Sequence, residues 1–226
     1  MGSTEAVGEK EVHKLIVSFS LTHVKFTAGD YFGQFMALVT LSPVYIMASY
    51  ATLLVYRRDS ITLYNLTGQM VSLLVNLVLK QCLNQPRPDQ IHSELEDSGM
   101  PSNHAQFIAY FAVINICQLC HKRSRSLSPF FQFLYSFYFL LLAFLVCFSR
   151  LYLHYHTLDQ VLVGACVGAI CALICFKLQL DYLVTITRFL ASLPIAKWAH
   201  FRDYSFFLFP PADEALVMSS SSGKDE

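Results

Sequence analysis

Five stretches of the chain contain no Asp, Glu, Lys or Arg, and this feature limits the possible folds more than any other. Each approaches or exceeds the roughly 17–25 residues that a helix needs to cross a hydrocarbon core about 30 Å thick. Apolar residues occur all round each stretch rather than on one stripe, as in lipid-embedded helices. A soluble core could bury one such helix, but not five. We therefore predict an all-α, multi-pass transmembrane helical bundle with about five spans, at residues 32–56, 61–79, 102–120, 129–148 and 160–176.

The composition supports this class and excludes others. Hydrophobic residues make up 54% of the 226 residues and charged residues 14%, whereas a soluble domain averages about 25% charged residues. The 16 basic residues are balanced by 16 acidic ones, so the chain lacks the basic field on which nucleic-acid binding depends. We expect the membrane bilayer to be a partner and nucleic acid not to be one.

The spans divide the chain into three parts. We predict an N-terminal lumenal segment at residues 1–31, a membrane domain at 32–203, and a cytosolic, partly disordered tail at 204–226. Within the membrane domain, Leu183–Phe201 is apolar but interrupted by charged residues and by Pro194. We interpret this stretch as an interfacial helix, with a sixth span as the alternative.

Cysteine usage gives no sign of a disulfide scaffold or a metal site. Most of the seven cysteines lie inside apolar runs, where they act as small packing residues. Cys117 and Cys120 have the spacing of metal ligands, but no second pair in a comparable setting completes the three or four ligands of a zinc site. We predict no metal and no cofactor.

The loops indicate the topology. The polar segments 80–101 and 149–159 are separated by two spans, so they emerge on the same membrane face. The opposite face carries Arg57 and Arg58 and the basic run at 122–125. By the positive-inside rule, that opposite face is cytoplasmic. The two polar segments are then expected to face the lumen or the exterior.

The first of three reactive clusters on that face combines Lys80 with Arg87. Lys80 closes the second span and can extend its ammonium group to the interface. Pro86 and Pro88 flank Arg87 and hold it outside any helix. Taken alone, these residues could be two ordinary interfacial cations.

The second cluster is Pro101-Ser102-Asn103-His104, directly before the third span. Ser102 is a favoured N-cap residue, and the first turn after it offers unpaired backbone N–H groups to an anion. Asn103 tolerates a left-handed backbone, which would help to turn those N–H groups inward. Taken alone, this cluster could be a simple helix cap.

The third cluster contains Arg150 at the end of the fourth span and His156 before the fifth. Thr157 and Gln160 have the spacing of a capping box, and Asp159 lies in the first turn of the helix that follows. A helix cap explains Asp159 and Gln160, but it does not explain Arg150 or His156.

Together the three clusters offer one coherent chemistry. Three fixed cations and a helix N-terminus can bind a phosphate group, and two histidines can supply a nucleophile and a proton donor. Phosphoryl transfer depends mainly on positioning and on charge stabilisation. The set therefore predicts phosphoryl transfer at the ends of the spans.

At these residues the chain resembles the type-2 phosphatidic-acid phosphatase and vanadium haloperoxidase superfamily. The resemblance implies an α-helical bundle and a phosphohistidine mechanism without a metal. His156 would attack phosphorus, His104 would protonate the leaving group, and the polar residues of the motifs would bind the phosphoryl oxygens. The matching motifs are Lys80…Arg87-Pro88, Pro101-Ser102-Asn103-His104 and Ser149-Arg150…His156.

The chain departs from the superfamily pattern at two positions. Asn103, which we include in the substrate-binding set with Lys80, Arg87, Ser102 and Arg150, replaces the usual Gly.

Gln160 stands four residues after His156, where the superfamily usually has Asp, and Asp159 precedes it. Either side chain could accept the Nδ1 proton of His156 and fix its tautomer. We include Asp159 in the catalytic set with His104 and His156.

The resemblance is strongest to the branch of the superfamily that hydrolyses dolichyl diphosphate, through Leu21–Val24, Met100–Phe107 and Tyr152–Val161. It implies a polyprenyl diphosphate substrate, a multi-pass location in the endoplasmic reticulum membrane with the site facing the lumen, and recycling of the lipid carrier of protein N-glycosylation. A phosphatase for phosphatidate or a sphingoid phosphate is the first alternative. A non-catalytic membrane scaffold is the second.

Overall fold

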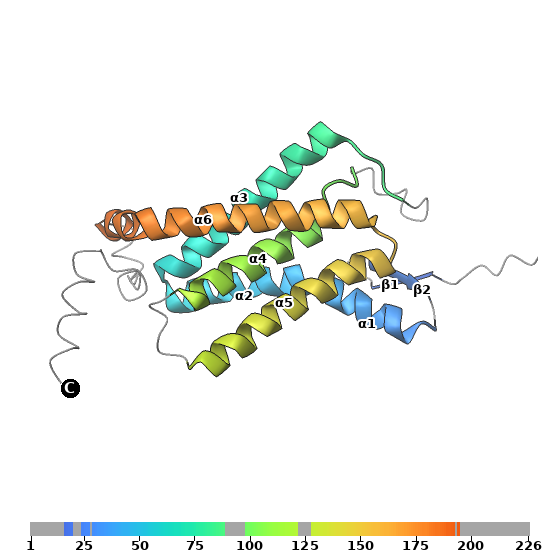
Figure 1. Cartoon of the computed structure of the whole chain (residues 1–226), viewed down its shortest axis with the longest axis horizontal. Coiled ribbons are helices and arrows are strands. Elements are labelled where there is room, and N and C mark those ends of the chain that lie inside the picture. Colours follow the sequence, from blue (N-terminus) through green and yellow to red (C-terminus); the bar gives the residue numbers. More distant parts are fainter. Residues whose placement is uncertain are drawn as a thin grey trace, which may run out of the picture.

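Six α-helices and one β-hairpin form the part of the chain that the computed structural model describes, which is residues 16–19, 24–27, 29–88, 98–121, 128–192 and 194. The hairpin pairs β1 (Ile16–Phe19) with β2 (Val24–Thr27) in antiparallel register, with Ile16 opposite Thr27. Figure 1 shows it beside the C-terminal end of α5. The hairpin was not predicted, but the prediction of an all-α helical bundle is confirmed. The helices are α1 (Tyr31–Thr40), α2 (Ser42–Arg57), α3 (Ser60–Leu83), α4 (Asn103–Cys120), α5 (Pro129–Tyr152) and α6 (Leu158–Ser192).

Four segments are long and apolar enough to cross a membrane. They are Tyr31–Arg57, Ser60–Leu83, Pro129–Tyr152 and Leu158–Tyr182. The fifth predicted stretch, 102–120, forms α4, which packs against α3, α5 and α6 in the middle of the bundle (Figure 1). The chain is therefore a multi-pass membrane protein with a central helix that its neighbours largely enclose.

The first predicted span consists of two helices, not one. α1 ends at Thr40 and α2 begins at Ser42, with Leu41 between them. Pro43 lies in the first turn of α2, and it has no N–H to donate to the preceding turn. The break follows from this missing hydrogen bond, for which Pro43 was the available sequence signal.

α1 is attached to α5 at one end of the bundle. Asp30 caps α1 by accepting a hydrogen bond from the Gly33 backbone N–H at 2.8 Å. The hydroxyl of Tyr152, at the end of α5, donates to the other carboxylate oxygen of Asp30 at 3.0 Å. One turn earlier in α5, the hydroxyl of Ser149 lies 2.8 Å from the hydroxyl of Thr40, at the end of α1. These contacts hold the end of α5 against α1.

The helix α3 is polar on its buried face, so the expectation that it would be apolar all round was wrong. Asn76 donates to the Gln106 side-chain oxygen at 2.7 Å, and the Gln106 amide donates to the Ser72 carbonyl at 2.6 Å. Near the other end, Gln118 donates to Asn65 at 2.7 Å. Polar side chains that are paired between helices tolerate a membrane interior. The buried residues on this face are Asn65, Gly68, Gln69, Ser72, Asn76 and Lys80.

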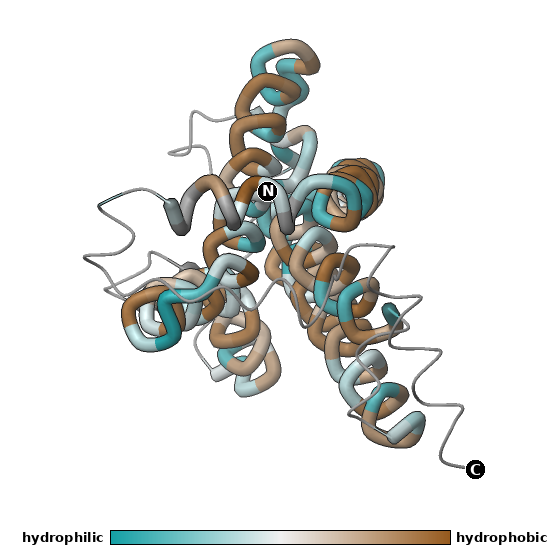
Figure 2. Tube along the Cα trace, turned by 90° about the vertical axis from the view of Figure 1, so that its left-hand side faces the viewer, coloured by the Kyte–Doolittle hydropathy of each residue, from teal (hydrophilic) through white to brown (hydrophobic). Residues whose placement is uncertain are grey.

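The opposite polarity holds on the outside of the bundle. α5 exposes a row of large apolar side chains, including Phe133, Phe137 and Phe144, and Figure 2 shows hydrophobic residues along the outer helices. Since lipid tails are apolar, these faces need no protein partner in a membrane. The bundle therefore carries much of its polarity inside.

The close contact between α4 and α6 depends on two glycines. A Cβ atom at Gly164 would lie 2.6 Å from the carbonyl oxygen of Ser102, and one at Gly168 would clash with the carbonyl oxygen of Gln106. Ala172, one turn further along, is fully buried. Small residues at this spacing let two membrane helices approach closely. The Gly164-x-x-x-Gly168 pattern can be read from the sequence alone.

We expected a separate helix to begin at Leu183, and this was wrong. α6 continues without interruption to Ser192, because no Gly or Pro occurs between Gly168 and Pro194. Its 35 residues span about 50 Å, more than the hydrocarbon core of a bilayer. Residues 195–226, which include the predicted tail, lie outside the described residues.

We predict that Gly168→Val lowers the stability of the bundle. The added side chain meets a backbone atom of α4, which cannot move without shifting that helix, and overpacking of this kind costs about 1–3 kcal/mol. Thermal unfolding of the detergent-solubilised protein should show a melting temperature several degrees lower. Cys166→Val, at an exposed position on the same helix, is the control and should change little. Equal melting temperatures for the two variants would contradict the proposed role of Gly168.

Candidate active site

The three sequence clusters lie together at one end of the bundle, where α3 and α5 end and α4 and α6 begin (Figure 1). Backbone hydrogen bonds join them. The Gly99 N–H, before α4, donates to the Gln85 carbonyl, after α3, at 2.6 Å. The Ser102 N–H donates to the Gln160 carbonyl in α6 at 3.0 Å. The first cluster is thus bound to the second, and the second to the third.

His104, in the first turn of α4, lies close to the charged residues of the other two clusters. It interacts electrostatically with Arg150, His156, Arg87 and Lys80, which come from three other parts of the chain. Lys80 and Arg150 are buried, and Arg87 is half-buried. The structure therefore gathers three cations and two imidazoles into one region.

A tight turn after α5 carries His156. His154 adopts a left-handed backbone with φ of 56°, which His tolerates better than most residues. The backbone N–H groups of Tyr155 and His156 then donate to the Arg150 carbonyl at 3.0 and 3.3 Å. The Arg150 guanidinium lies over the Tyr155 ring, 4.0 Å from its centre. This turn fixes His156 next to Arg150, and His154 itself points to an exposed position.

The predicted capping box is present at the start of α6. The Gln160 backbone N–H donates to the Thr157 hydroxyl oxygen at 3.4 Å. In return, the Thr157 N–H donates to the side-chain oxygen of Gln160 at 3.3 Å. Both contacts are long, but the reciprocal pattern is the expected one.

The Gln160 side chain also links His156 to the first cluster. Its oxygen lies 3.1 Å from Nδ1 of His156. Its amide nitrogen donates to the Pro86 carbonyl at 2.9 Å and reaches the Gln85 side-chain oxygen at 3.5 Å. Pro86 directly precedes Arg87, so one buried amide connects the turn of His156 with the loop of Arg87. A carboxylate could not make the second set of contacts, because it has no proton to donate.

The contacts of Gln160 define the tautomer of His156. The amide orientation follows from its neighbours, since the nitrogen faces the Pro86 carbonyl and the oxygen faces the Thr157 N–H. The oxygen must therefore accept from Nδ1–H of His156, which leaves the lone pair on Nε2. Burial, and next the positive charge of Arg150, lowers the pKa of His156 to about 3. The ring is then neutral at physiological pH, as a nucleophile must be.

Several buried polar atoms at the site have no hydrogen-bond partner within the described part of the chain. They are Oγ of Ser102, Oδ1 of Asn103 and Nε of Arg150. Ser102 occupies the predicted N-cap position of α4, but its side chain makes no capping hydrogen bond. Unsatisfied buried polar groups are costly. A hydroxyl and a guanidinium in this state are suited to a ligand with several oxygen atoms.

Asp159 is placed differently from the other predicted residues. Its side chain is exposed, whereas Gln160, the next residue, is buried and contacts His156. Lys80, Arg87, Ser102, Asn103, His104, Arg150 and His156 all lie at the convergence point. Among the described residues, no group of three His, Cys, Asp or Glu side chains could hold a metal ion.

Sequence reasoning missed the residues that support the site from behind. Gln85 and the Pro86 carbonyl hold Gln160, the ring of Tyr155 covers Arg150, and Gly164 admits the first turn of α4. Of these, only the glycine spacing had a recognisable sequence signal.

The chain is similar to one known family and to several known proteins. The PAP2 superfamily model matches residues 61–182, which include all three motifs. "Dolichyldiphosphatase 1" of Homo sapiens is 34% identical over 193 residues, which cover 82% of this chain and 81% of the relative. "Dolichyldiphosphatase 1" of Dictyostelium discoideum is 34% identical over 200 residues, 87% of each chain. "Dolichyldiphosphatase" of Saccharomyces cerevisiae is 31% identical over 161 residues, 69% of this chain and 67% of the relative. No solved structure matches the chain.

We predict that His156 remains a neutral Nδ1–H imidazole from pH 8 down to about pH 5, because its pKa lies well below the usual value of about 6.5. Nitrogen NMR of the protein with labelled histidine can read tautomer and charge directly, and His156→Asn identifies the signal by its loss. His154, which is exposed, serves as the internal control for an accessible ring. Protonation of His156 near pH 6.5 would contradict the prediction.

Proposed function

Because this chain belongs to the PAP2 superfamily, we propose that it hydrolyses dolichyl diphosphate to dolichyl phosphate and inorganic phosphate through a phosphohistidine. The substrate follows from the names of the relatives. The observation that carries the mechanism is the buried His156, whose Nδ1 lies 3.1 Å from the Gln160 side-chain oxygen and whose backbone N–H donates to the Arg150 carbonyl.

In the first step, Nε2 of His156 attacks the terminal phosphorus atom of the diphosphate. An N–P bond forms, and the bond between that phosphorus and the bridging oxygen breaks. His104 donates a proton to the bridging oxygen, and dolichyl phosphate leaves. The negative charge of the bound diphosphate favours the protonated form of His104 that this step needs.

In the second step, water attacks the phosphohistidine. His104, now neutral, takes a proton from the water, an O–P bond forms, and the N–P bond to His156 breaks. Inorganic phosphate is released, and both rings return to their starting states. The same residue thus acts first as an acid and then as a base.

The cations bind the oxygens of the transferring phosphoryl group. Arg150 and Lys80 are buried and Arg87 is half-buried, so their charges act in a setting of low dielectric constant. The Ser102 hydroxyl, which has no hydrogen-bond partner among the described residues, and the backbone N–H groups that begin α4 add neutral donors. Asn103 sits in the same first turn.

We assign the orienting role to Gln160 and not to Asp159. The amide oxygen of Gln160 is 3.1 Å from Nδ1 of His156, and the Asp159 side chain is exposed. A neutral amide stabilises a charged imidazole less than a carboxylate does. In exchange, it connects His156 to the loop that carries Arg87.

We further propose that the protein lies in the endoplasmic reticulum membrane with its site facing the lumen, where the product re-enters the lipid cycle of protein N-glycosylation. The support is the distribution of cations. Arg57 precedes α3 and Lys80 lies near its end, so a full span separates them. Arg57 and the basic run at 122–125 then lie on the cytoplasmic face.

The proposed function is tested by phosphate release from dolichyl diphosphate in microsomes that contain the protein. Sealed vesicles should release little phosphate from added substrate, and permeabilised vesicles should release it readily, because the site faces the lumen. His156→Ala should abolish the release, since the proposed covalent intermediate forms on Nε2 of His156.

Three outcomes would contradict the proposal. Equal activity in sealed and permeabilised vesicles would place the site on the cytoplasmic face. A clear preference for phosphatidate over dolichyl diphosphate would favour the alternative lipid phosphatase. Equal, slow release by wild type and His156→Ala would favour a non-catalytic scaffold.

The assignment of Gln160 gives a separate prediction. Gln160→Ala should lower kcat by roughly 10–100-fold, the usual effect of removing a group that orients a reactive side chain. Asp159→Ala is the matched control and should stay within roughly twofold of wild type, because its side chain faces solvent. Steady-state kinetics on the same substrate measure both. The reverse order of effects would restore the role to Asp159.

A further inference from the structure

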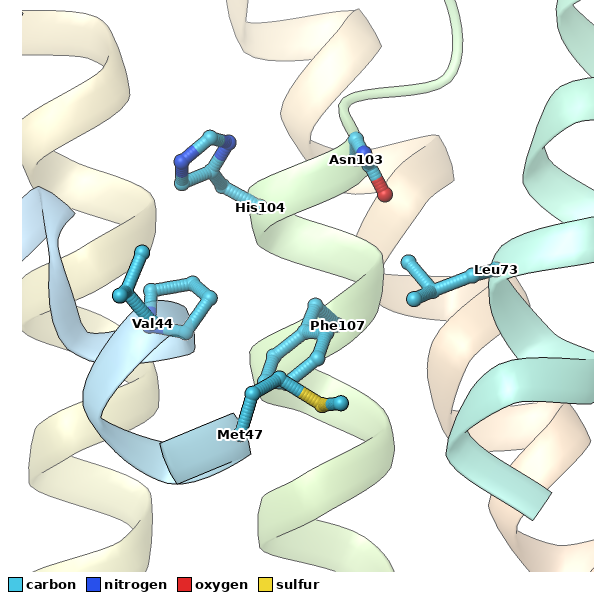
Figure 3. Close-up of a pocket in the computed structure, with 7 residues that line it drawn as sticks. Val44, Met47, Leu73, Asn103, His104 and Phe107 are labelled. Carbon is cyan, nitrogen blue, oxygen red and sulfur yellow. The ribbon is translucent and has the colours of Figure 1, made fainter. Parts of the chain in front are cut away.

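An apolar groove leads away from His104 between α2, α3 and α4. It has a volume of about 320 Å³. Figure 3 shows His104 and Asn103 at one end of it, with Phe107 and Met47 at the other and Leu73 on the α3 side. Apart from His104 and Asn103, its lining is apolar: Pro43, Val44, Met47, Leu73 and Phe107.

We propose that this groove binds the first isoprene units of the substrate's hydrocarbon chain. The inference rests on the proposed function, and it names the path that the tail takes from the site into the membrane. A branched, unsaturated hydrocarbon needs a concave apolar surface, and a groove of this volume can hold a short run of isoprene units but not a whole polyprenyl chain.

The chemistry of the leaving group selects this groove. The bond that breaks separates the terminal phosphorus from the phosphate that carries the tail. His104 protonates the oxygen on the tail side of that bond, so the tail must depart past His104. His104 lines the groove, whereas His156 is not among the lining residues.

The two walls of the groove come from helices that lie loosely together. α2 makes sparse contact with α3 and α4, and Pro43 and Val44, in the first turn of α2, line the same groove as His104. Val44 is 58% exposed, so the groove is open at the surface that faces lipid. A polyprenyl chain could therefore enter sideways from the bilayer while its diphosphate reaches the cations.

The neighbouring face of α3 closes one alternative path for the tail. Ser72 and Asn76 point into the bundle and are hydrogen-bonded to Gln106, which closes that side with polar groups. Leu73, one residue further, lines the groove, and Leu74 is 61% exposed. The boundary between the polar interior and the groove therefore lies between Ser72 and Leu73.

The test narrows the groove and compares two substrates with the same reacting group. Leu73→Trp should lower the ratio of kcat/KM for dolichyl diphosphate to kcat/KM for methyl diphosphate, which has no tail, by roughly tenfold, the loss expected when about two buried methylene groups are displaced. Leu74→Trp is the matched control on the lipid-facing side and should leave the ratio unchanged. Met47→Trp, which narrows the groove from α2, should act like Leu73→Trp.

A second measurement does not depend on turnover. A prenyl diphosphate with a diazirine on its first isoprene unit should label peptides that contain Met47, Leu73 or Phe107 after illumination, and excess dolichyl diphosphate should reduce this labelling. Labelling only at the outer face of α5 would show bulk lipid contact and would overturn the proposal.

The two experiments distinguish failure of the groove assignment from failure of the proposed function. If wild type hydrolyses dolichyl diphosphate but both tryptophan variants keep the wild-type ratio, or lose activity on both substrates equally, the groove assignment is wrong and the function stands. If wild type releases no phosphate from dolichyl diphosphate, the proposed function fails, and labelling of the groove residues still decides where a prenyl chain binds.

Discussion

The close approach of α4 and α6 is the constraint on which the rest of the structure depends. Gly164 and Gly168 allow backbone to meet backbone, so the Ser102 N–H can bond to the Gln160 carbonyl. This contact brings the first turn of α4, with His104, beside the first turn of α6, with His156 just before it. Helices at an ordinary separation of 8–10 Å, set by larger side chains, would hold the two imidazoles further apart.

The polar buried face of α3 also helps to bring the site residues together. Its buried polar face forms hydrogen bonds to α4 at Asn76 and Asn65, and the same face ends in Lys80. In a membrane, hydrogen bonds of this kind contribute to helix association because lipid offers polar groups no alternative. The hydrogen bonds between α3 and α4 therefore fix the rotation of α3, and this rotation places Lys80 at the site. The adjacent, less polar face is left to form one wall of the groove.

Sequence reasoning placed the predicted site residues on one membrane face, and in the structure all of them except the exposed Asp159 lie together at one end of the bundle. It could not choose between Asp159 and Gln160. Neighbouring residues on a helix point about 100° apart, so the choice depends on how α6 is rotated against His156. That rotation is set by contacts between Gln160 and the loop at Pro86, a residue 74 positions earlier, and no local pattern encodes it. The hairpin and the single long α6 were also not predicted. Hydropathy reports the polarity of side chains, and it does not show where strands pair or where a helix ends.

By itself, the sequence determined the membrane setting, the helical class and which basic and histidine side chains stand at the ends of the spans. These follow from uncharged runs and from side-chain chemistry, which are properties of the residues and need no neighbours. Only the tertiary structure decided which buried amide holds His156, that the Ser102 hydroxyl has no partner within the described part of the chain, and that an apolar groove begins at His104. Each of these depends on the distance and rotation between helices that are remote in the chain, and packing alone fixes those quantities.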